Sequence, residues 1–213
     1  MIVYNQQLSH YVSDLFAAED EALRYIRLET PNQGLPDIGI EPEEGRFLQF
    51  LAATCRAKLA LEIGTLGGYS SVWIARGLQP GGRLITIEKS ARHAEVAQAH
   101  LAYSGAAAQV EIRVGDAHQI LPGLAGLGPF DFIFIDAEKS GNPTYYEWAL
   151  ENLRPGGVLA VHNAFWGGSV AQDVSGPAID EVRSFNALVA QDRRVISTIY
   201  PAGDGTLVAV KLG

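Results

Sequence analysis

The sequence predicts an α/β fold: a mostly parallel, Rossmann-like sheet of seven strands with helices on both faces and an antiparallel C-terminal strand. Two observations predict it. From residue 59 onward, short apolar segments alternate with segments of helical periodicity, which is typical of parallel strands joined by helices. Near the C-terminus, Ala202-Gly203-Asp204-Gly205 links the last two apolar segments, and a short glycine-containing link indicates a hairpin of antiparallel strands.

The chain of 213 residues is long enough for one domain with a substantial core. We expect a single domain over residues 1–213, with a helical N-terminal cover over 1–56 and the Rossmann-like core over 57–213. No apolar run of about 18 residues is present, and residues 1–10 lack the basic and apolar parts of a signal peptide. We therefore expect a cytoplasmic protein with no membrane partner.

The charge and the cysteine content narrow the function classes further. The formal net charge is −8, and an acidic chain lacks the basic surface that holds a phosphate backbone, so a small-molecule partner is favoured over nucleic acid. Cys55 is the sole cysteine, which excludes an internal disulfide and a cysteine-based zinc cluster. We expect Cys55 to be buried on a helix.

The N-terminal part is predicted to be helical and to lie outside the repeating pattern. Apolar residues at roughly helical spacing over 4–29 indicate one or two helices. Three prolines and two glycines over 30–42 indicate a loop. Pro42-Glu43-Glu44 begins a further helix that runs to about residue 55, because proline and acidic residues favour a helix start. These elements are free to cover a site.

The core elements follow in order. Strands are predicted over residues 59–63, 83–88, 110–114, 130–136 and 158–162, with helices over 69–78, 90–104, 116–121 and 142–152 between them. Pro155-Gly156-Gly157 is expected to form the turn into the fifth strand. A glycine-containing loop over 166–177, a helix around 179–190, and strands over 195–200 and 206–211 complete the chain.

The link after the first strand contains Gly64, Gly67 and Gly68. Glycines there allow a ligand to approach the backbone closely, and the next helix presents free N–H groups. The pattern E-x-G-x-x-x-G differs from the dinucleotide fingerprint G-x-G-x-x-G, which disfavours an NAD-dependent oxidoreductase. Glu62 suits a ligand that carries an ammonium or a sulfonium, and S-adenosylmethionine (SAM) carries both. An ordinary strand-to-helix turn is the alternative.

Polar or ionisable residues follow each of the five predicted parallel strands. Because ligands of open α/β sheets bind beyond the carboxyl ends of the strands, five such ends predict a site. The residues are Glu62, Glu88, Asp116, Asp136, and His162 with Asn163. Glu88 can accept ribose hydroxyls or cap the helix near residue 90. Asp116 with Ala117 can meet an adenine amino group or act as an N-cap.

The fourth and fifth strands end in residues suited to chemistry. Asp136, His162 and Asn163 are all possible ligands of one divalent metal. Lys139 is expected either to share the mouth of the site or to be solvated, and His162 is equally compatible with a core histidine bonded to backbone. Among the remaining histidines, we expect His93 and His100 to face solvent, and His118 to lie on a helix surface.

With these residues assembled, the chain resembles the class I SAM-dependent O-methyltransferases, in particular the family of catechol and caffeoyl-coenzyme A O-methyltransferases. The resemblance covers about residues 40–213. The motifs that carry it are Leu61-Glu62-Ile63-Gly64-Thr65 with Gly68-Tyr69-Ser70, Thr86-Ile87-Glu88, Gly115-Asp116-Ala117, the run FIFIDAEK at 132–139, Leu153-Arg154-Pro155-Gly156-Gly157, Asn163 with Trp166-Gly167, and Gly203-Asp204-Gly205.

The resemblance implies methyl transfer from SAM to a hydroxyl of a small, aromatic, catechol-like acceptor by a homodimer. It implies a cofactor site made of Glu62, Gly64, Thr65, Gly68 and Ser70 at the methionine part, Glu88 at the ribose, and Asp116 and Ala117 at the adenine, with Asp136 adjoining. Asp136 would also bind a divalent metal that holds the acceptor, with His162 and Asn163 as the other candidate ligands. Lys139 would be the base that takes the phenolic proton.

His162 departs from the aspartate that the family usually has before the asparagine. An imidazole in place of a carboxylate removes a negative charge from the site. This weakens the binding of Mg²⁺ and relatively favours Mn²⁺ or softer cations. Three possibilities follow: a different metal, metal-free transfer with His162 as a base beside Lys139, or an altered acceptor. The alternative function is a SAM-binding protein with altered or lost catalysis. The acceptor pocket is predicted to be lined by residues 31–42, by Tyr145 or Tyr146, and by Phe165 and Trp166.

Overall fold

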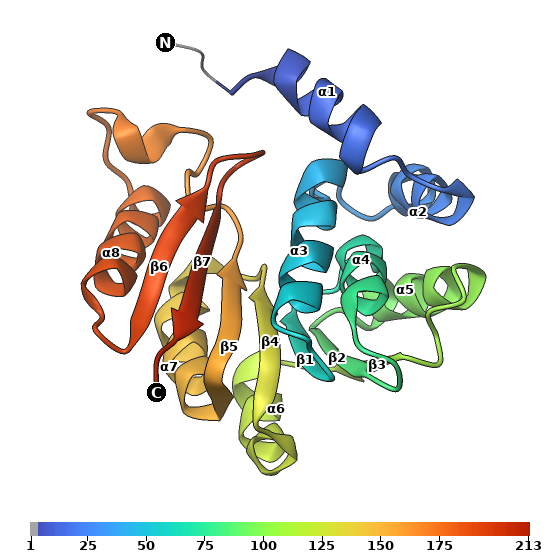
Figure 1. The fold of residues 1–213 in the computed structure, drawn as a ribbon. Coiled ribbons are helices and arrows are strands. Elements are labelled where there is room, and N and C mark those ends of the chain that lie inside the picture. The colour runs from blue at the N-terminus through green and yellow to red at the C-terminus, as the bar shows by residue number, and fades with distance from the viewer. Residues whose placement is uncertain (1–3) are drawn as a thin grey trace.

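The computed structural model describes residues 4–213 and shows a seven-stranded sheet with the strand order β3-β2-β1-β4-β5-β7-β6 (Figure 1). The strands are β1 Leu59–Ile63, β2 Arg83–Glu88, β3 Val110–Val114, β4 Phe130–Ile135, β5 Leu153–Val161, β6 Val195–Tyr200 and β7 Thr206–Lys211. Strands β1 to β5 are parallel, whereas β7 pairs antiparallel with both β5 and β6. The predicted fold class is confirmed.

Helices surround this sheet. They are α1 Gln6–Phe16, α2 Glu21–Asn32, α3 Pro42–Thr54, α4 Tyr69–Gly77, α5 Ala91–Tyr103, α6 Ala117–Leu124, α7 Asn142–Asn152 and α8 Pro177–Gln191, with short 3₁₀ turns η1 Ala125–Leu127, η2 Lys139–Gly141 and η3 Ser169–Ala171. Within residues 4–213, no helix is both long and apolar enough to cross a membrane.

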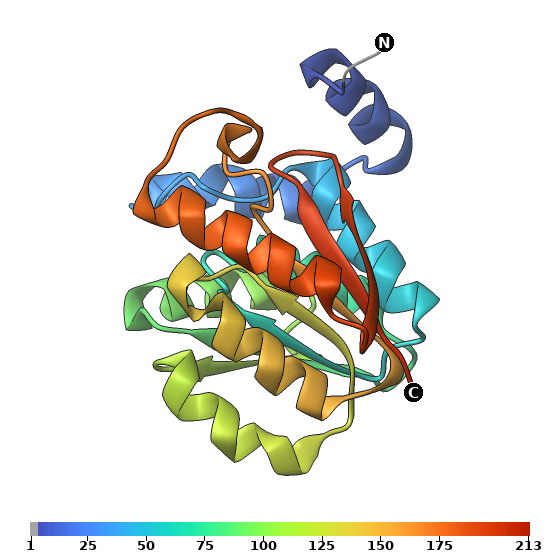
Figure 2. The same cartoon turned by 90° about the vertical axis from the view of Figure 1, so that its left-hand side faces the viewer.

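The core has two layers because side chains alternate between the two faces of each strand. Ala60, Leu84 and Phe132 belong to one buried cluster, which includes residues of α3, α4 and α5. Leu61, Ile85 and other strand residues of the opposite parity pack with α6, α7 and α8, which lie side by side over the near face in Figure 2. Burial on both faces explains why the strands read as continuous apolar runs.

The main differences from the predicted elements lie at their ends. Strand β5 begins at Leu153, because Leu153 pairs with Phe130 before the register shifts and Val158 pairs with Phe132. The segment 154–157 is therefore an irregularity inside the strand rather than a turn before it. Helix α2 continues to Asn32 and contains Pro31, where a loop was expected. Cys55 is buried, as predicted, at the C-terminal cap of α3.

Candidate active site

A cavity of about 1130 Å³ lies at the carboxyl ends of the parallel strands. Its wall includes residues that follow β1, β2, β3, β4 and β5, and residues 27–41 of α2 and the segment after it. This volume exceeds that of a typical pocket for one drug-sized ligand, so a nucleoside cofactor and a small acceptor fit together. The predicted site at this edge of the sheet is therefore a real cavity, and the N-terminal segment covers it.

The glycine turn after β1 approaches the end of β4. Gly64 has φ 99°, and a Cβ built on it would overlap the carbonyl oxygen of Asp136. Only glycine satisfies both requirements. Gly64, Thr65 and Gly67 line the cavity, but Gly68 is absent from its wall. Gly68 is instead the N-cap of α4, with φ 83°, so its predicted contact with the cofactor is not supported by its position.

Glu62 lies behind the cavity wall rather than on it. The residue is fully buried, and its carboxylate accepts hydrogen bonds from the hydroxyls of Ser70 (2.6 Å), Ser71 and Thr86 (2.7 Å). Burial raises the pKa of Glu62 to about 7, against the effect of the three hydroxyls. Ser70 lines the cavity, so Glu62 acts on the site by orienting Ser70.

Glu88 accepts hydrogen bonds from two segments of backbone. Its Oε2 accepts from the backbone N–H groups of Thr65 (3.1 Å) and Leu66 (2.9 Å), and its Oε1 accepts from the N–H of Ser90 at 2.8 Å. Glu88 also lines the cavity. It therefore joins the glycine turn to the start of α5.

Asp116 likewise caps a helix and lines the cavity, with Ala117 beside it. Its Oδ1 accepts from the N–H of His118 at 2.9 Å. The imidazole of His118 stacks on Tyr145, with ring centroids 4.7 Å apart, and Tyr145 is also on the wall. Both His118 and Tyr145 also contact the carboxylate of Glu138, so the start of α6 and the segment after β4 share this part of the wall.

The prediction that His100 faces solvent is wrong. His100 is 3% exposed, and its Nδ1 lies 2.8 Å from the carbonyl oxygen of Gly67. The ring also meets Tyr25 of α2 edge-on. Helical periodicity in α5 did not reveal this burial, because the covering residue comes from the N-terminal segment, which lies outside the repeating core.

Lys139 and Asp136 face each other on the cavity wall. Lys139 Nζ lies 3.6 Å from Asp136 Oδ1, and the Lys139 side chain is only 8% exposed. Burial lowers the pKa of Lys139 below its ordinary value of 10.5, although Asp136 opposes this. Burial would raise the pKa of Asp136, but His162 and Lys139 outweigh it and lower the value. The predicted placement of Lys139 at the mouth of the site is what the structure shows.

His162 is held between two carboxylates. Its Nε2 lies 3.0 Å from Glu44 Oε1, and its Nδ1 lies 3.3 Å from Asp136 Oδ2. The second contact is an ion pair rather than a well-aligned hydrogen bond. Burial opposes protonation, but hydrogen bonding and attraction to Asp136 and Glu44 raise the pKa of His162 to about 10. Both carboxylates therefore favour the protonated imidazolium over the neutral ring.

Glu44 was missed by the sequence reasoning, which assigned it only to the first turn of α3. It is 3% exposed and lies 118 positions before its partner His162. Gly203 of the β6–β7 turn also packs against its carboxylate. The sequence shows Glu44 only as the second of two acidic residues in the first turn of a helix. Acidic residues are common at that position, so the pattern does not indicate a site.

The residues present do not fit a divalent metal. Asp136 and Asn163 line the cavity, but His162 does not, and an imidazolium has no free lone pair with which to bind a cation. Lys139 already supplies positive charge beside Asp136. Among residues 4–213, no group of three or more histidine, cysteine, aspartate or glutamate side chains is arranged to hold a metal ion.

The aromatic residues predicted to line the acceptor pocket divide into two groups. Tyr145 and Trp166 lie on the cavity wall, together with residues 36–41. Tyr146 does not; it is fully buried and meets Phe185 of α8 edge-on. Phe165 packs against Gly205 instead. Tyr146 and Phe165 are therefore removed from the predicted lining, because their neighbours in the chain occupy the positions that face the cavity.

Comparisons with known proteins point to one family. The family model described as O-methyltransferase matches residues 13–212. A protein named catechol O-methyltransferase from Niastella koreensis is 44% identical over 197 residues, covering 91% of this chain and 89% of its own length. A protein of the same name from Mycobacterium tuberculosis is 42% identical over 160 residues, covering 75% of this chain and 72% of its own.

Solved structures give the same result. The O-methyltransferase from Bacillus cereus in complex with SAH has a TM-score of 0.88 and 37% identity, and the match covers 96% of this chain and 97% of that one. The O-methyltransferase TomG from Streptomyces achromogenes in complex with SAM has a TM-score of 0.86 and 41% identity, with coverage of 97% and 96%.

Proposed function

The chain belongs to the O-methyltransferase family, and from this premise we propose that it transfers the methyl group of SAM to a phenolic hydroxyl of a small catechol-type acceptor without the help of a divalent metal. The observation that carries the proposal is Lys139, whose nearly buried side chain lines the cavity 3.6 Å from Asp136. The names of the relatives from Niastella koreensis and Mycobacterium tuberculosis support the acceptor class.

Lys139 is suited to the role of base. A phenol with a pKa near 10 is a poor nucleophile at neutral pH, so it must lose its proton as it reacts. Burial lowers the pKa of Lys139, which increases the share of the neutral amine that can accept this proton. After the transfer, the ammonium stands beside the carboxylate of Asp136, which stabilises it.

The cavity supplies the remaining requirements. SAM, when bound, supplies a methyl group on a positively charged sulfur. Gly64, Thr65 and Glu88 line the part of the cavity near the glycine turn, where Glu88 offers carboxylate oxygens to hydroxyl donors. Trp166 provides an aromatic surface on the wall of the same cavity, on which a planar acceptor can stack. Holding both substrates in one cavity lowers the barrier by proximity.

His162 takes the place of a metal cation in this proposal. Its imidazolium lies between Asp136 and Glu44. The protein side chain thus supplies the positive charge that a metal ion would otherwise supply beside Asp136. A protonated imidazole cannot act as a base, and His162 is absent from the cavity wall. We therefore assign proton removal to Lys139 alone.

The test is methyl transfer from labelled SAM to catechol by chelator-treated protein, with a caffeoyl thioester as a second acceptor. We expect labelled product from catechol, at a rate that adding Mg²⁺, Mn²⁺ or Co²⁺ does not raise. Activity that returns only with an added metal would contradict the metal-free step. Cofactor binding without turnover of any phenolic acceptor would favour the alternative of a binding protein with lost catalysis.

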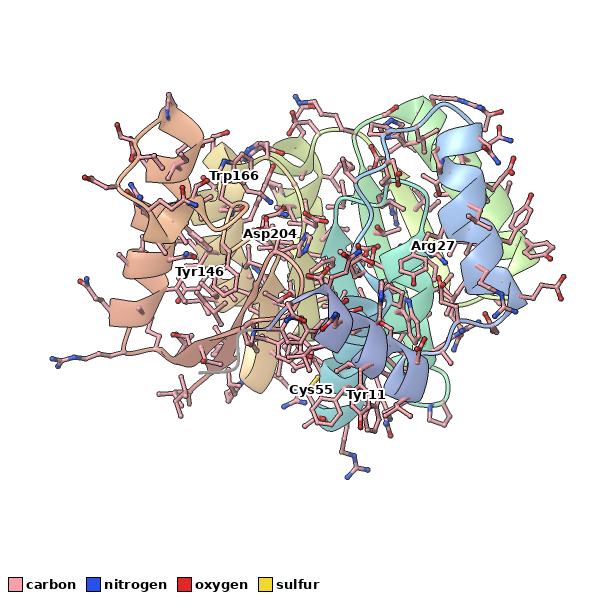
Figure 3. The ribbon with its side chains drawn as sticks, turned by 90° about the horizontal axis from the view of Figure 1, so that it is seen from above. Tyr11, Arg27, Cys55, Tyr146, Trp166 and Asp204 are labelled. Carbon is pink, nitrogen blue, oxygen red and sulfur yellow. The ribbon has the colours of Figure 1, made fainter. Side chains whose placement is uncertain are left out.

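We further propose a homodimer in which α1 contributes to the contact. Ser9 and Ser13 of α1 donate hydrogen bonds to Glu43 at 2.5 and 2.6 Å, so the polar side of this helix faces the body. Tyr11 and Leu15 are 62% and 57% exposed. Figures 1 and 2 show α1 standing away from the sheet layers, and Figure 3 labels Tyr11 on it. An outward apolar helix face is typical of an interface.

A charge on this face is expected to prevent dimerisation. For the substitution Leu15→Asp we expect a monomer, because a carboxylate would lose its hydration in an apolar contact. Sedimentation velocity at micromolar concentration measures the result, and Gln7→Glu on the same helix is the matched control. A monomeric wild-type protein, or a dimeric Leu15→Asp variant, would contradict the assignment of this face.

A further inference from the structure

Two residues of the cavity wall have unusual backbone conformations. Asn163 has φ 60° and Trp166 has φ 48°, and both line the cavity that also contains Lys139. The left-handed region is unfavourable for residues with a Cβ, most of all for a bulky one such as tryptophan. Such conformations persist only where neighbouring contacts enforce them. The contacts of residues 163–174, the acceptor-side loop, therefore determine the shape of this wall.

One set of contacts comes from the β6–β7 turn. The carboxylate of Asp204 accepts a hydrogen bond from Asn163 Nδ2 at 2.9 Å and another from the backbone N–H of Gly167 at 2.6 Å. The backbone N–H of Phe165 also donates to the carbonyl of Asp204 at 2.9 Å. One side chain thus fixes the loop on both sides of Trp166. Figure 3 labels Asp204 and Trp166 close to each other in the view from above.

A second set of contacts comes from α8. The guanidinium of Arg183 donates to four backbone carbonyls of the acceptor-side loop, at distances between 2.5 and 3.1 Å; these belong to Ser169, Val170, Gln172 and Val174. Its nearest carboxylate, Asp180, is farther away at 3.7 Å. One helical turn later, Asn186 Nδ2 donates to the carbonyl of Ala164 at 2.8 Å. The guanidinium N–H groups of Arg183 therefore bind the backbone of the loop rather than a carboxylate.

We propose that Asp204 and Arg183 are positioning residues for the acceptor, which hold Asn163 and Trp166 in their strained conformations against the cavity. Neither Asp204 nor Arg183 lines the cavity, so each acts on the acceptor through the loop. The carboxylate of Asp204 also favours the protonated form of Lys139 electrostatically, so KM rather than kcat reports on the loop. The acceptor is a planar aromatic molecule that stacks on Trp166, and loosening the loop weakens its binding while the cofactor end stays intact. This inference rests on the proposed function, because that function supplies the acceptor.

The position of the two anchors makes the effect selective. Asp204 lies in the turn between β6 and β7, and Arg183 lies on α8. The glycine turn is held by other residues, namely Glu88, His100 and the start of α4. Among the described residues, the hydrogen bonds of Asp204 and Arg183 go to the acceptor-side loop and none reaches Gly64, Thr65 or Glu88. A change at either anchor is therefore expected to separate acceptor binding from cofactor binding.

The experiment uses Arg183→Lys and Asp204→Asn in the full chain. The single ammonium of lysine cannot reach all four carbonyls. The side chain of asparagine has one oxygen and one N–H₂ group, so it can accept from Asn163 or from Gly167 but has a donor where the other requires an acceptor. We expect the KM for catechol to rise about tenfold, equivalent to roughly 1.4 kcal/mol of acceptor binding, with the Kd for SAM unchanged. Asp180→Asn and Asp173→Asn, which leave the described loop contacts in place, are the matched controls.

A second readout does not depend on turnover. Hydrogen exchange measured by mass spectrometry is expected to be faster over residues 163–174 in both variants, and unchanged over residues 64–70. An unchanged catechol KM together with unchanged exchange in this loop would overturn the proposal, as would an equal loss of SAM affinity. If the wild-type protein methylates no phenol, the proposed function fails, and the exchange data still decide whether Asp204 and Arg183 hold the loop.

Discussion

Replacing Lys139 by methionine is expected to lower kcat for methyl transfer by a factor of about 10² to 10⁴, the usual contribution of a general base. The unbranched apolar side chain of methionine fills much of the same buried space beside Asp136 but cannot take the phenolic proton. The Kd for SAM should stay unchanged, because Lys139 contributes to the chemistry rather than to the glycine turn. Single-turnover transfer from labelled SAM measures the effect.

The dependence of kcat on pH tests the same assignment. The neutral amine is the active form, so kcat of the wild-type protein should rise with pH and level off at a pKa below 10.5, since burial lowers the pKa of Lys139. In Lys139→Met this rise should disappear, and Lys139→Arg should remain inactive because arginine stays protonated. The control is Lys58→Met, because Lys58 is exposed and lies directly before β1. A full rise with pH in Lys139→Met would assign proton removal to another group.

The substitution His162→Asp is expected to make transfer depend on a divalent cation. Asp136, Glu44 and the new carboxylate would lie together with Asn163, an oxygen donor set that suits Mg²⁺ or Mn²⁺. Without a cation, these acids repel one another, and removing one partner of a buried ion pair costs about 3–5 kcal/mol. We therefore expect the variant to have a lowered Tm that added Mg²⁺ raises.

Activity should follow the same pattern as stability. In His162→Asp, chelation is expected to lower kcat/KM for catechol by about 10 to 100-fold, the usual effect of disturbing a metal site, and Mg²⁺ should restore it. The wild-type protein should be indifferent to both treatments. His10→Asp, on the exposed side of α1, controls for the added charge. A wild-type enzyme that loses activity on chelation would contradict metal-free transfer, and a cation bound by His162 would have to displace the proton of its ring.

Much of the molecule could be predicted from local patterns. Apolar runs gave the bounds of β1, β2, β3, β6 and β7 as the structure has them, because a run of apolar residues between turn signals is a property of the chain itself. The glycine turn and most of the polar residues at the strand ends were also placed correctly, since parallel strands bring their carboxyl ends to one edge, although Glu62 and His162 lie behind the cavity wall. Glu88, Asp116 and Asp136 all line the cavity for that reason.

Contacts between distant segments could not be predicted in this way. Burial of His100 depends on α2, and the loop that carries Trp166 depends on Asp204 and Arg183. Periodicity describes which side of a helix is apolar, but it contains no information about which remote segment packs there. The same limit explains why Tyr145 and Tyr146 could not be distinguished before the packing of α7 was known.

The sequence by itself therefore determined the sheet, the glycine turn and the set of residues that meet at its edge. Only the tertiary structure decided what the most unusual of them does. His162 reads as a metal ligand beside Asp136 until α3 brings Glu44 to within 3.0 Å of its ring. A second buried carboxylate stabilises the protonated ring electrostatically, and this turns a candidate ligand into a fixed cation.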